Sequence, residues 1–155
     1  MATQKYIGML NGVILCVDSV GVGRFDCTFY HKFSRIGVRV SSEEQLLFQL
    51  EDLFDELRFP FSGTNPRLFT QQFHTPVKEE RKQVMSDQEL LEKHGELGTF
   101  IIRVQHRQNS SWQGRITWVD EDKTMNFRSA WEMMKLIDSA MEQYKEDKDK
   151  TTDWQ

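Results

Sequence analysis

The chain of 155 residues has a formal net charge of −4, and 38% of its residues are hydrophobic while 28% are charged. This composition is typical of a folded globular protein, because a disordered chain contains fewer core-forming residues. No apolar run approaches the ~20 residues that a membrane-spanning helix requires. The N-terminal sequence MATQKYIGML lacks the basic segment and long apolar stretch of a signal peptide, so we expect a cytoplasmic protein with no membrane association.

The first part of the chain predicts three strands and a helix. Segments rich in β-branched and aromatic residues, the first two separated by the turn-like sequence DSVGVGR, predict strands at 5–17, 25–32 and 36–40. The apolar spacing then changes to that of a helix, with leucine and phenylalanine on one stripe as far as Leu57. Ser41 and Glu44 fit a capping box, in which a hydroxyl and a carboxylate satisfy free amides of the first helical turn.

The middle of the chain is interpreted as a connector, because all three prolines fall between residues 60 and 76. Ser86 and Glu89 form a second capping box, and Gly95 is a suitable stop, so a short helix is predicted at 87–94. The second part of the chain repeats the strand and helix signals. Strands are predicted at 99–106, 112–119 and 123–128, followed by a helix at 130–144 capped by Ser129 with Glu132, and a frayed acidic tail at 146–155.

The two parts of the chain have the same order of predicted elements. A shift of 87 positions aligns the strands, Ser42 with Ser129, and the apolar stripes of the two helices without a gap over residues 12–54. We therefore predict an α+β fold of two βββα units with antiparallel sheets, at 1–59 and 99–145, joined by a Pro-containing connector at 60–98. Few aligned positions are identical, and any strand–cap–helix pair can be aligned in this way, so the duplication stays open.

Strand alternation in the second unit places polar side chains together. Phe100, Ile102 and Val104 share one predicted face, and the alternate positions face the other way. If the apolar sets face the final helix, the opposite face presents seven arginine and amide side chains: Arg103, Gln105, Arg107, Gln113, Arg115, Asn126 and Arg128.

This polar face suggests an anionic ligand. A guanidinium is a planar donor that matches phosphate or carboxylate, and amide side chains add donor and acceptor groups that can read a base. The first hypothesis is therefore a non-enzymatic binding module for a nucleotide or nucleic acid. The open alternative is an ordinary solvated face whose arginines pair with carboxylates of the same molecule.

The other expectations concern partners, cofactors and catalysis. Acidic pairs along residues 43–56 favour a different function, a protein-interaction adaptor or inhibitor. An exposed sheet edge would allow pairing of two copies into a dimer. Cys16 and Cys27 are expected to be reduced core thiols. No catalytic motif and no metal-ligand spacing occurs, so we expect no enzyme, cofactor or metal site, although a site assembled from scattered residues remains a third alternative.

Overall fold

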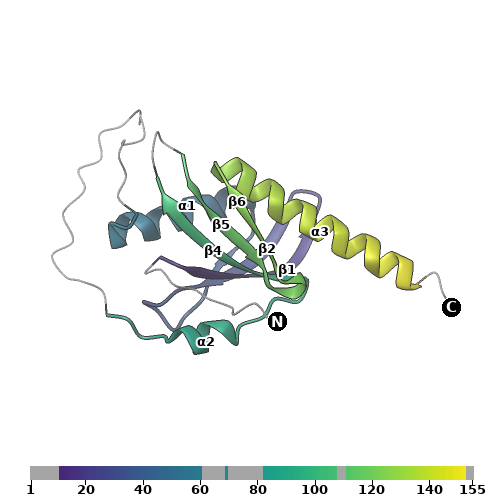
Figure 1. The fold of residues 1–155 in the computed structure, drawn as a ribbon, viewed down its shortest axis with the longest axis horizontal. Helices are drawn as coiled ribbons and strands as arrows, with labels where there is room; N and C mark the ends of the chain where they lie inside the picture. The colour runs from purple at the N-terminus through teal and green to yellow at the C-terminus, as the bar shows by residue number, and fades with distance from the viewer. Residues whose placement is uncertain (1–10, 61–68, 70–81, 108–110, 153–155) are drawn as a thin grey trace.

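Six strands form a single antiparallel sheet in the computed structural model, which describes the backbone of residues 11–60, 69, 82–107 and 111–152 and the side chains of these residues as far as 145. The strand order is β3-β2-β1-β4-β5-β6 (Figure 1). The strands are β1 (Val13–Gly21), β2 (Arg24–Tyr30), β3 (Val38–Val40), β4 (Gly98–His106), β5 (Gln113–Trp118) and β6 (Lys123–Phe127). The helices are α1 (Glu43–Leu57), α2 (Asp87–Leu91) and α3 (Ala130–Thr152), with a short 3-10 turn, η1, at Val119–Glu121.

The two predicted three-stranded units share one sheet, because β1 and β4 pair with each other at its centre. Ile14 lies opposite Ile101 in this pairing, with Val13 opposite Ile102 on one side. The α+β class and the antiparallel pairing are confirmed, whereas the expectation of separate sheets is wrong. Among the described strands, β3 and β6 form the two edges of this single sheet, and the other four have a neighbour on each side and are not open to edge-to-edge pairing.

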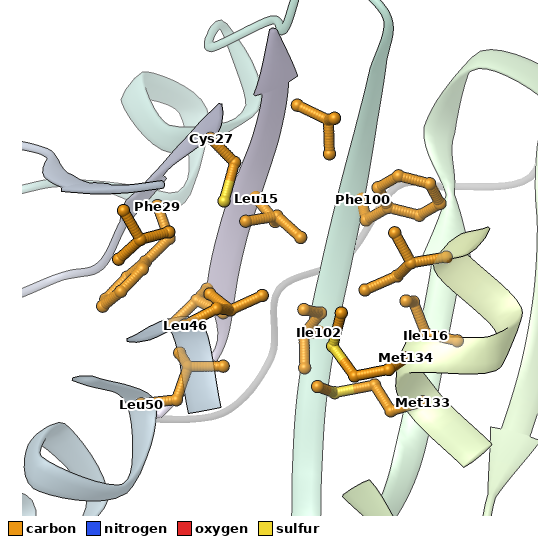
Figure 2. Close-up of a cluster of buried hydrophobic side chains, with 14 of the residues drawn as sticks. Leu15, Cys27, Phe29, Leu46, Leu50, Phe100, Ile102, Ile116, Met133 and Met134 are labelled. Carbon is orange, nitrogen blue, oxygen red and sulfur yellow. The ribbon is translucent and has the colours of Figure 1, made fainter. Parts of the chain in front are cut away.

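Helices α1 and α3 cover the same face of the sheet. Their inward side chains, including Leu46 and Leu50 of α1 and Met133 and Met134 of α3, point toward the apolar residues of the strands (Figure 2). These side chains are almost fully buried, and each large aliphatic side chain removed from water contributes about 1.5–3 kcal/mol. The core shared by the two helices therefore holds both parts of the chain in one domain.

Helix α2 lies on the opposite face of the sheet and covers its central strands. Leu90 of α2 and the preceding Met85 are buried against Ile14, Cys16 and Ile101. Two ion pairs, Lys32–Asp87 at 3.1 Å and Arg35–Glu89 at 3.0 Å, connect the helix to the segment that follows β2. No member of this second apolar cluster, in the part of the chain that the structure describes, comes from β5 or β6. The outward face of β5 and β6 is therefore not packed against α2.

Several element boundaries differ from the sequence-based predictions. The cap of α1 is Ser42, whose hydroxyl accepts from the Gln45 amide at 3.1 Å, and not Ser41. The predicted caps Ser86 and Ser129 are confirmed by the bonds from the amides of Glu89 and Glu132.

The first strand and the last two helices differ in length. Strand β1 continues to Gly21, which shortens the predicted turn to Val22 and Gly23, and Gly23 has a positive φ of 68°. Residues 5–10 of the predicted first strand lie outside the described residues, and residues 11 and 12 precede β1. Helix α2 ends at Leu91, before the predicted limit. Helix α3 continues past Tyr144 to Thr152, so it includes residues 146–152 of the predicted frayed tail.

The two cysteines lie on opposite faces of the sheet. Cys27 belongs to the core under α1 and α3, whereas Cys16 lies under α2. Both are free and buried, as expected, and burial raises the pKa of each thiol to about 12. Among the helices described, none is both long and apolar enough to cross a membrane.

Candidate functional site

Three of the seven predicted residues form a row across β4, β5 and β6. Arg103 lies opposite Arg115 in the β4–β5 pairing, and Arg115 lies opposite Asn126 in the β5–β6 pairing. The neighbouring positions Ile102 and Ile116 are buried under α3, so strand alternation directs the row to the opposite face. We call this row, with the adjacent Thr117 and Thr124, the arginine face.

The side chains of the arginine face are connected by hydrogen bonds. Arg115 donates from Nε to the Asn126 Oδ1 at 3.1 Å, and Arg103 donates from Nη2 to the Thr117 Oγ1 at 3.5 Å. The hydroxyls of Thr117 and Thr124 are 2.8 Å apart. The bond to the neutral Asn126 amide leaves the positive charge of Arg115 in place, directly across the strand from Arg103.

Arg115 is the most open cation of this face. Its side chain is exposed, and no carboxylate among the described residues lies within ion-pair distance of it. Arg103, directly across the strand, is half-buried. Like charges directly opposite each other on an antiparallel pair are destabilising, by roughly 0.2–1 kcal/mol. The pairing of two arginines is therefore not explained by the stability of the sheet.

A β-bulge removes Arg107 from the predicted set. The β4–β5 register shifts between Val104 and His106, so Gln105 is the extra residue and remains exposed on the bulge. After the bulge, His106 takes the position opposite Gln113, and Arg107 is turned to the side of the sheet that the helices cover. The expectation that Arg107 lies on the same face as Arg103 is wrong, because one inserted residue reverses the alternation.

Arg107 instead joins the end of the β4–β5 hairpin to the C-terminal end of α1. Its side chain is 6% exposed and donates from Nη1 to the Asp55 carboxylate at 2.7 Å and from Nε to the Pro60 carbonyl at 2.8 Å. A further bond runs from Nη2 to the Phe54 carbonyl at 3.4 Å, and the guanidinium lies 5.8 Å from the centre of the Phe54 ring. These contacts are structural, since all three guanidinium nitrogens donate to groups of the same molecule.

The last two predicted residues lie where β5 begins and β6 ends. Gln113 is half-buried and donates to the Arg128 carbonyl at 3.5 Å. The exposed Arg128 guanidinium forms an ion pair with Glu132, one turn into α3, at 2.9 Å. The hydrogen bonds that Arg128 donates to Glu132 raise the pKa of Arg128 and lower the pKa of the Glu132 carboxyl. Arg128 is therefore already paired with an internal carboxylate.

Strand alternation was enough to find Arg103, Arg115 and Asn126, and it would also have found Thr117 and Thr124. It gave no signal for the bulge, which depends on how two strands pair. Among the described residues, no group of three or more histidine, cysteine, aspartate or glutamate side chains is arranged to hold a metal ion.

Comparisons of the chain with protein-family models, with curated proteins and with solved structures found no match. The function is therefore argued from the chemistry of the arginine face.

Proposed function

We propose that the protein is a non-enzymatic binding module that holds an anionic, phosphate-bearing ligand, a nucleotide or nucleic acid, against the arginine face. The observation that supports this proposal is the position of Arg115. Its exposed guanidinium bonds to the neutral Asn126 amide, it pairs with no described carboxylate, and a second guanidinium, that of Arg103, lies directly across the strand. A phosphate between the two groups would relieve their repulsion and accept several charge-assisted hydrogen bonds.

The residues around the guanidinium groups suggest how the ligand is held. Asn126 and the threonine pair of the arginine face offer neutral donors and acceptors beside the charge. The outward positions of β5 and β6 carry arginine, asparagine, threonine and glutamine, and none of them is aromatic. Stacked bases need aromatic platforms, and β5 and β6 offer none, while β4 adds only the exposed His106 at its bulge, opposite Gln113. We therefore expect contacts to phosphate to dominate, with weak sequence preference and strong salt dependence.

We also propose that the two parts of the chain are equivalent βββα units. The support is that the strand registers coincide after a shift of 87 positions. Ile14 pairs with Tyr30 and Ile101 with Thr117, and the shift from Val17 to Ser19 corresponds to the bulge that turns Arg107. At the centre of the sheet, Ile14 faces Ile101, its own equivalent.

The comparison of units separates the arginine face from its counterpart. The row Arg103, Arg115 and Asn126 corresponds in the first unit to Cys16, Thr28 and Arg39. Cys16 is buried beneath α2, whereas the second row is not packed against a helix on this face. The polar row is thus specific to the second unit, as expected if the units have taken different roles.

The test is retention of the full chain by an immobilised single-stranded oligonucleotide and by immobilised nucleotide, measured over a range of salt concentrations. The double variant Arg103→Ala with Arg115→Ala should elute earlier, and the slope of log affinity against log salt should fall by about 0.7 for each lost phosphate contact. The single variant Arg115→Ala is compared with Arg39→Ala, the matched control, because each removes one positive charge and Arg39 lies on the opposite edge strand, β3.

Three results would overturn the proposal. The parent protein does not bind either matrix at low salt, the double variant binds like the parent, or Arg39→Ala weakens retention as much as Arg115→Ala does. In the last case, overall charge and not the arginine face would be responsible for binding.

A further inference from the structure

A shallow pocket of about 320 Å³ lies between α1 and the beginning of α3, at a distance from the arginine face because both helices cover the other side of the sheet. Its walls are formed by side chains of both helices and of the segment that precedes β5: Leu47, Phe48, Glu51, Ser111, Trp112, Ser129, Ala130 and Trp131. We call it the α1–α3 pocket. Its volume is sufficient for one or two side chains of another molecule.

Two large aromatic rings at this pocket are exposed. Phe48 is 66% exposed and Trp131 is 71% exposed, one from each helix. The inward side of α1 is occupied by Leu46 and Leu50, so Phe48 is not needed for the core. Aromatic side chains contribute more to interfaces than most others do, because each buries a large apolar area with few rotatable bonds. Their gathering at one pocket therefore marks a contact surface.

The negative charge around the pocket indicates a positively charged partner. The 15 residues of α1 include six acidic residues and no basic residue. Glu51 lines the pocket beside Phe48 and is half-buried, yet its carboxylate forms no side-chain hydrogen bond and no ion pair with any described residue. Burial, followed by the nearby Asp55 and Asp52, raises the pKa of Glu51, and Arg107 partly opposes this effect. A cation from outside would satisfy this carboxylate.

One cation of the molecule already uses the aromatic wall. Lys135 lies one turn after Trp131 and places its Nζ 5.5 Å from the centre of the indole ring. This geometry is that of a cation–π contact, in which the face of the ring attracts positive charge. A planar guanidinium is suited to the same ring, because it stacks on aromatic faces and pairs with a carboxylate at the same time.

We propose that the α1–α3 pocket docks a basic segment of a partner protein, with an arginine or lysine side chain against Glu51 and an adjacent apolar residue between Phe48 and Trp131. This interaction is independent of the arginine face, which has the opposite charge and lies on the opposite side of the sheet. The occupant we assign is a separate polypeptide, because the Glu51 carboxylate, which has no partner among the described residues, calls for a cation and the exposed rings call for an apolar surface beside it.

The test is a selection of random peptides displayed on phage against the full chain, followed by fluorescence titration of the enriched peptides. We expect the enriched sequences to contain arginine or lysine next to a leucine or an aromatic residue. Trp131→Ala and Phe48→Ala should each weaken their binding by about tenfold, as at interface hot spots. Glu51→Gln should weaken binding and reduce its salt dependence, and it preserves the size of the side chain.

Controls separate the pocket from general stickiness and from the arginine face. Ile36→Ala removes another large apolar side chain, 80% exposed, from a different part of the surface and should not change binding. Arg115→Ala should also leave peptide binding unchanged. Because Phe48, Trp131 and Ile36 are all exposed, the circular dichroism spectra and melting temperatures of these variants should match those of the parent.

The proposal fails if the enriched peptides lack basic residues, if no peptide distinguishes the parent from Trp131→Ala, or if Ile36→Ala weakens binding equally. Sedimentation of the protein alone tests whether a second copy of the chain occupies the pocket. Self-association that Trp131→Ala abolishes would make a second copy the occupant and would overturn the assignment to a basic partner. Oligonucleotide retention that stays unchanged when an enriched peptide is added would support two separate sites.

Discussion

Replacement of Arg107 by alanine is the sharpest test of the bulge that reverses alternation in β4. If this side chain belonged to a solvated polar face, its loss would have little effect on stability. In the structure, its guanidinium instead donates to the Asp55 carboxylate and to the carbonyls of Pro60 and Phe54 at the end of α1. Arg107→Ala should therefore weaken the attachment of the β4–β5 hairpin to that helix.

The magnitude follows from these contacts. A hydrogen bond to a charged group contributes about 1.5–3 kcal/mol, and a cation near a helix C-terminus contributes roughly 0.3–1 kcal/mol. Asp55 is 48% exposed and is rehydrated when its partner is removed, so the large penalty of an unpaired buried charge does not apply. We expect a loss of about 3 kcal/mol in the free energy of unfolding, which corresponds to roughly 6–12 °C in melting temperature for a chain of this size.

Urea unfolding followed by circular dichroism measures this loss, with Arg128→Ala as the matched control. Arg128 also pairs with a carboxylate, but its side chain is 87% exposed and its partner is one helical turn away. Exposed pairs of this kind contribute little to the free energy of unfolding, because solvent screens both charges. Arg107→Lys should fall between the two, because lysine keeps the charge and loses the planar set of donors. Equal effects of Arg107→Ala and Arg128→Ala would refute the placement of Arg107.

Three further predictions concern charge and thiol chemistry. Arg115→Thr should raise the free energy of unfolding by roughly 0.2–1 kcal/mol, with a larger gain at low salt, because it removes the repulsion across β4 and β5; a loss of stability would contradict the cross-strand geometry. Burial and the nearby Asp138 raise the pKa of Glu43, so the Glu43 carboxyl binds a proton more tightly in the folded state than in the unfolded chain. The stability that this protonation contributes is present at low pH and is lost as pH rises through the raised pKa. Glu43→Gln should consequently raise the free energy of unfolding at neutral pH by on the order of 0.5 kcal/mol and should give no gain at a pH below the ordinary range of glutamate pKa values. Urea titrations at several pH values measure this, and a difference between variant and parent that does not change with pH would contradict it. Cys16 and Cys27, with thiol pKa values of about 12, should react with a thiol reagent at neutral pH only when the protein unfolds, and rapid labelling of the native protein would show that either is accessible.

The sequence by itself determined the elements and their faces. Residue preference and apolar alternation identified the six described strands, although β1 continues beyond its predicted end at 17. Helical spacing and capping signals identified the three helices, although the cap of α1 is the serine after the predicted one. Alternation also placed Arg103, Arg115 and Asn126 on one side of three strands, because side-chain direction in a regular strand depends only on position along the chain. These are local properties, and local sequence is sufficient to predict them.

The tertiary structure alone decided what depends on pairing between distant segments. The joining of β1 to β4 turned two predicted sheets into one, and it is set by contacts between residues about ninety positions apart. The bulge after Val104 arises from the register of two strands, and it moved Arg107 from the surface to a buried pair with Asp55. The meeting of Phe48, Glu51 and Trp131 at one pocket likewise requires two helices to lie on the same face of the sheet. Such arrangements result from the packing of the whole core, so no single segment of the sequence encodes them.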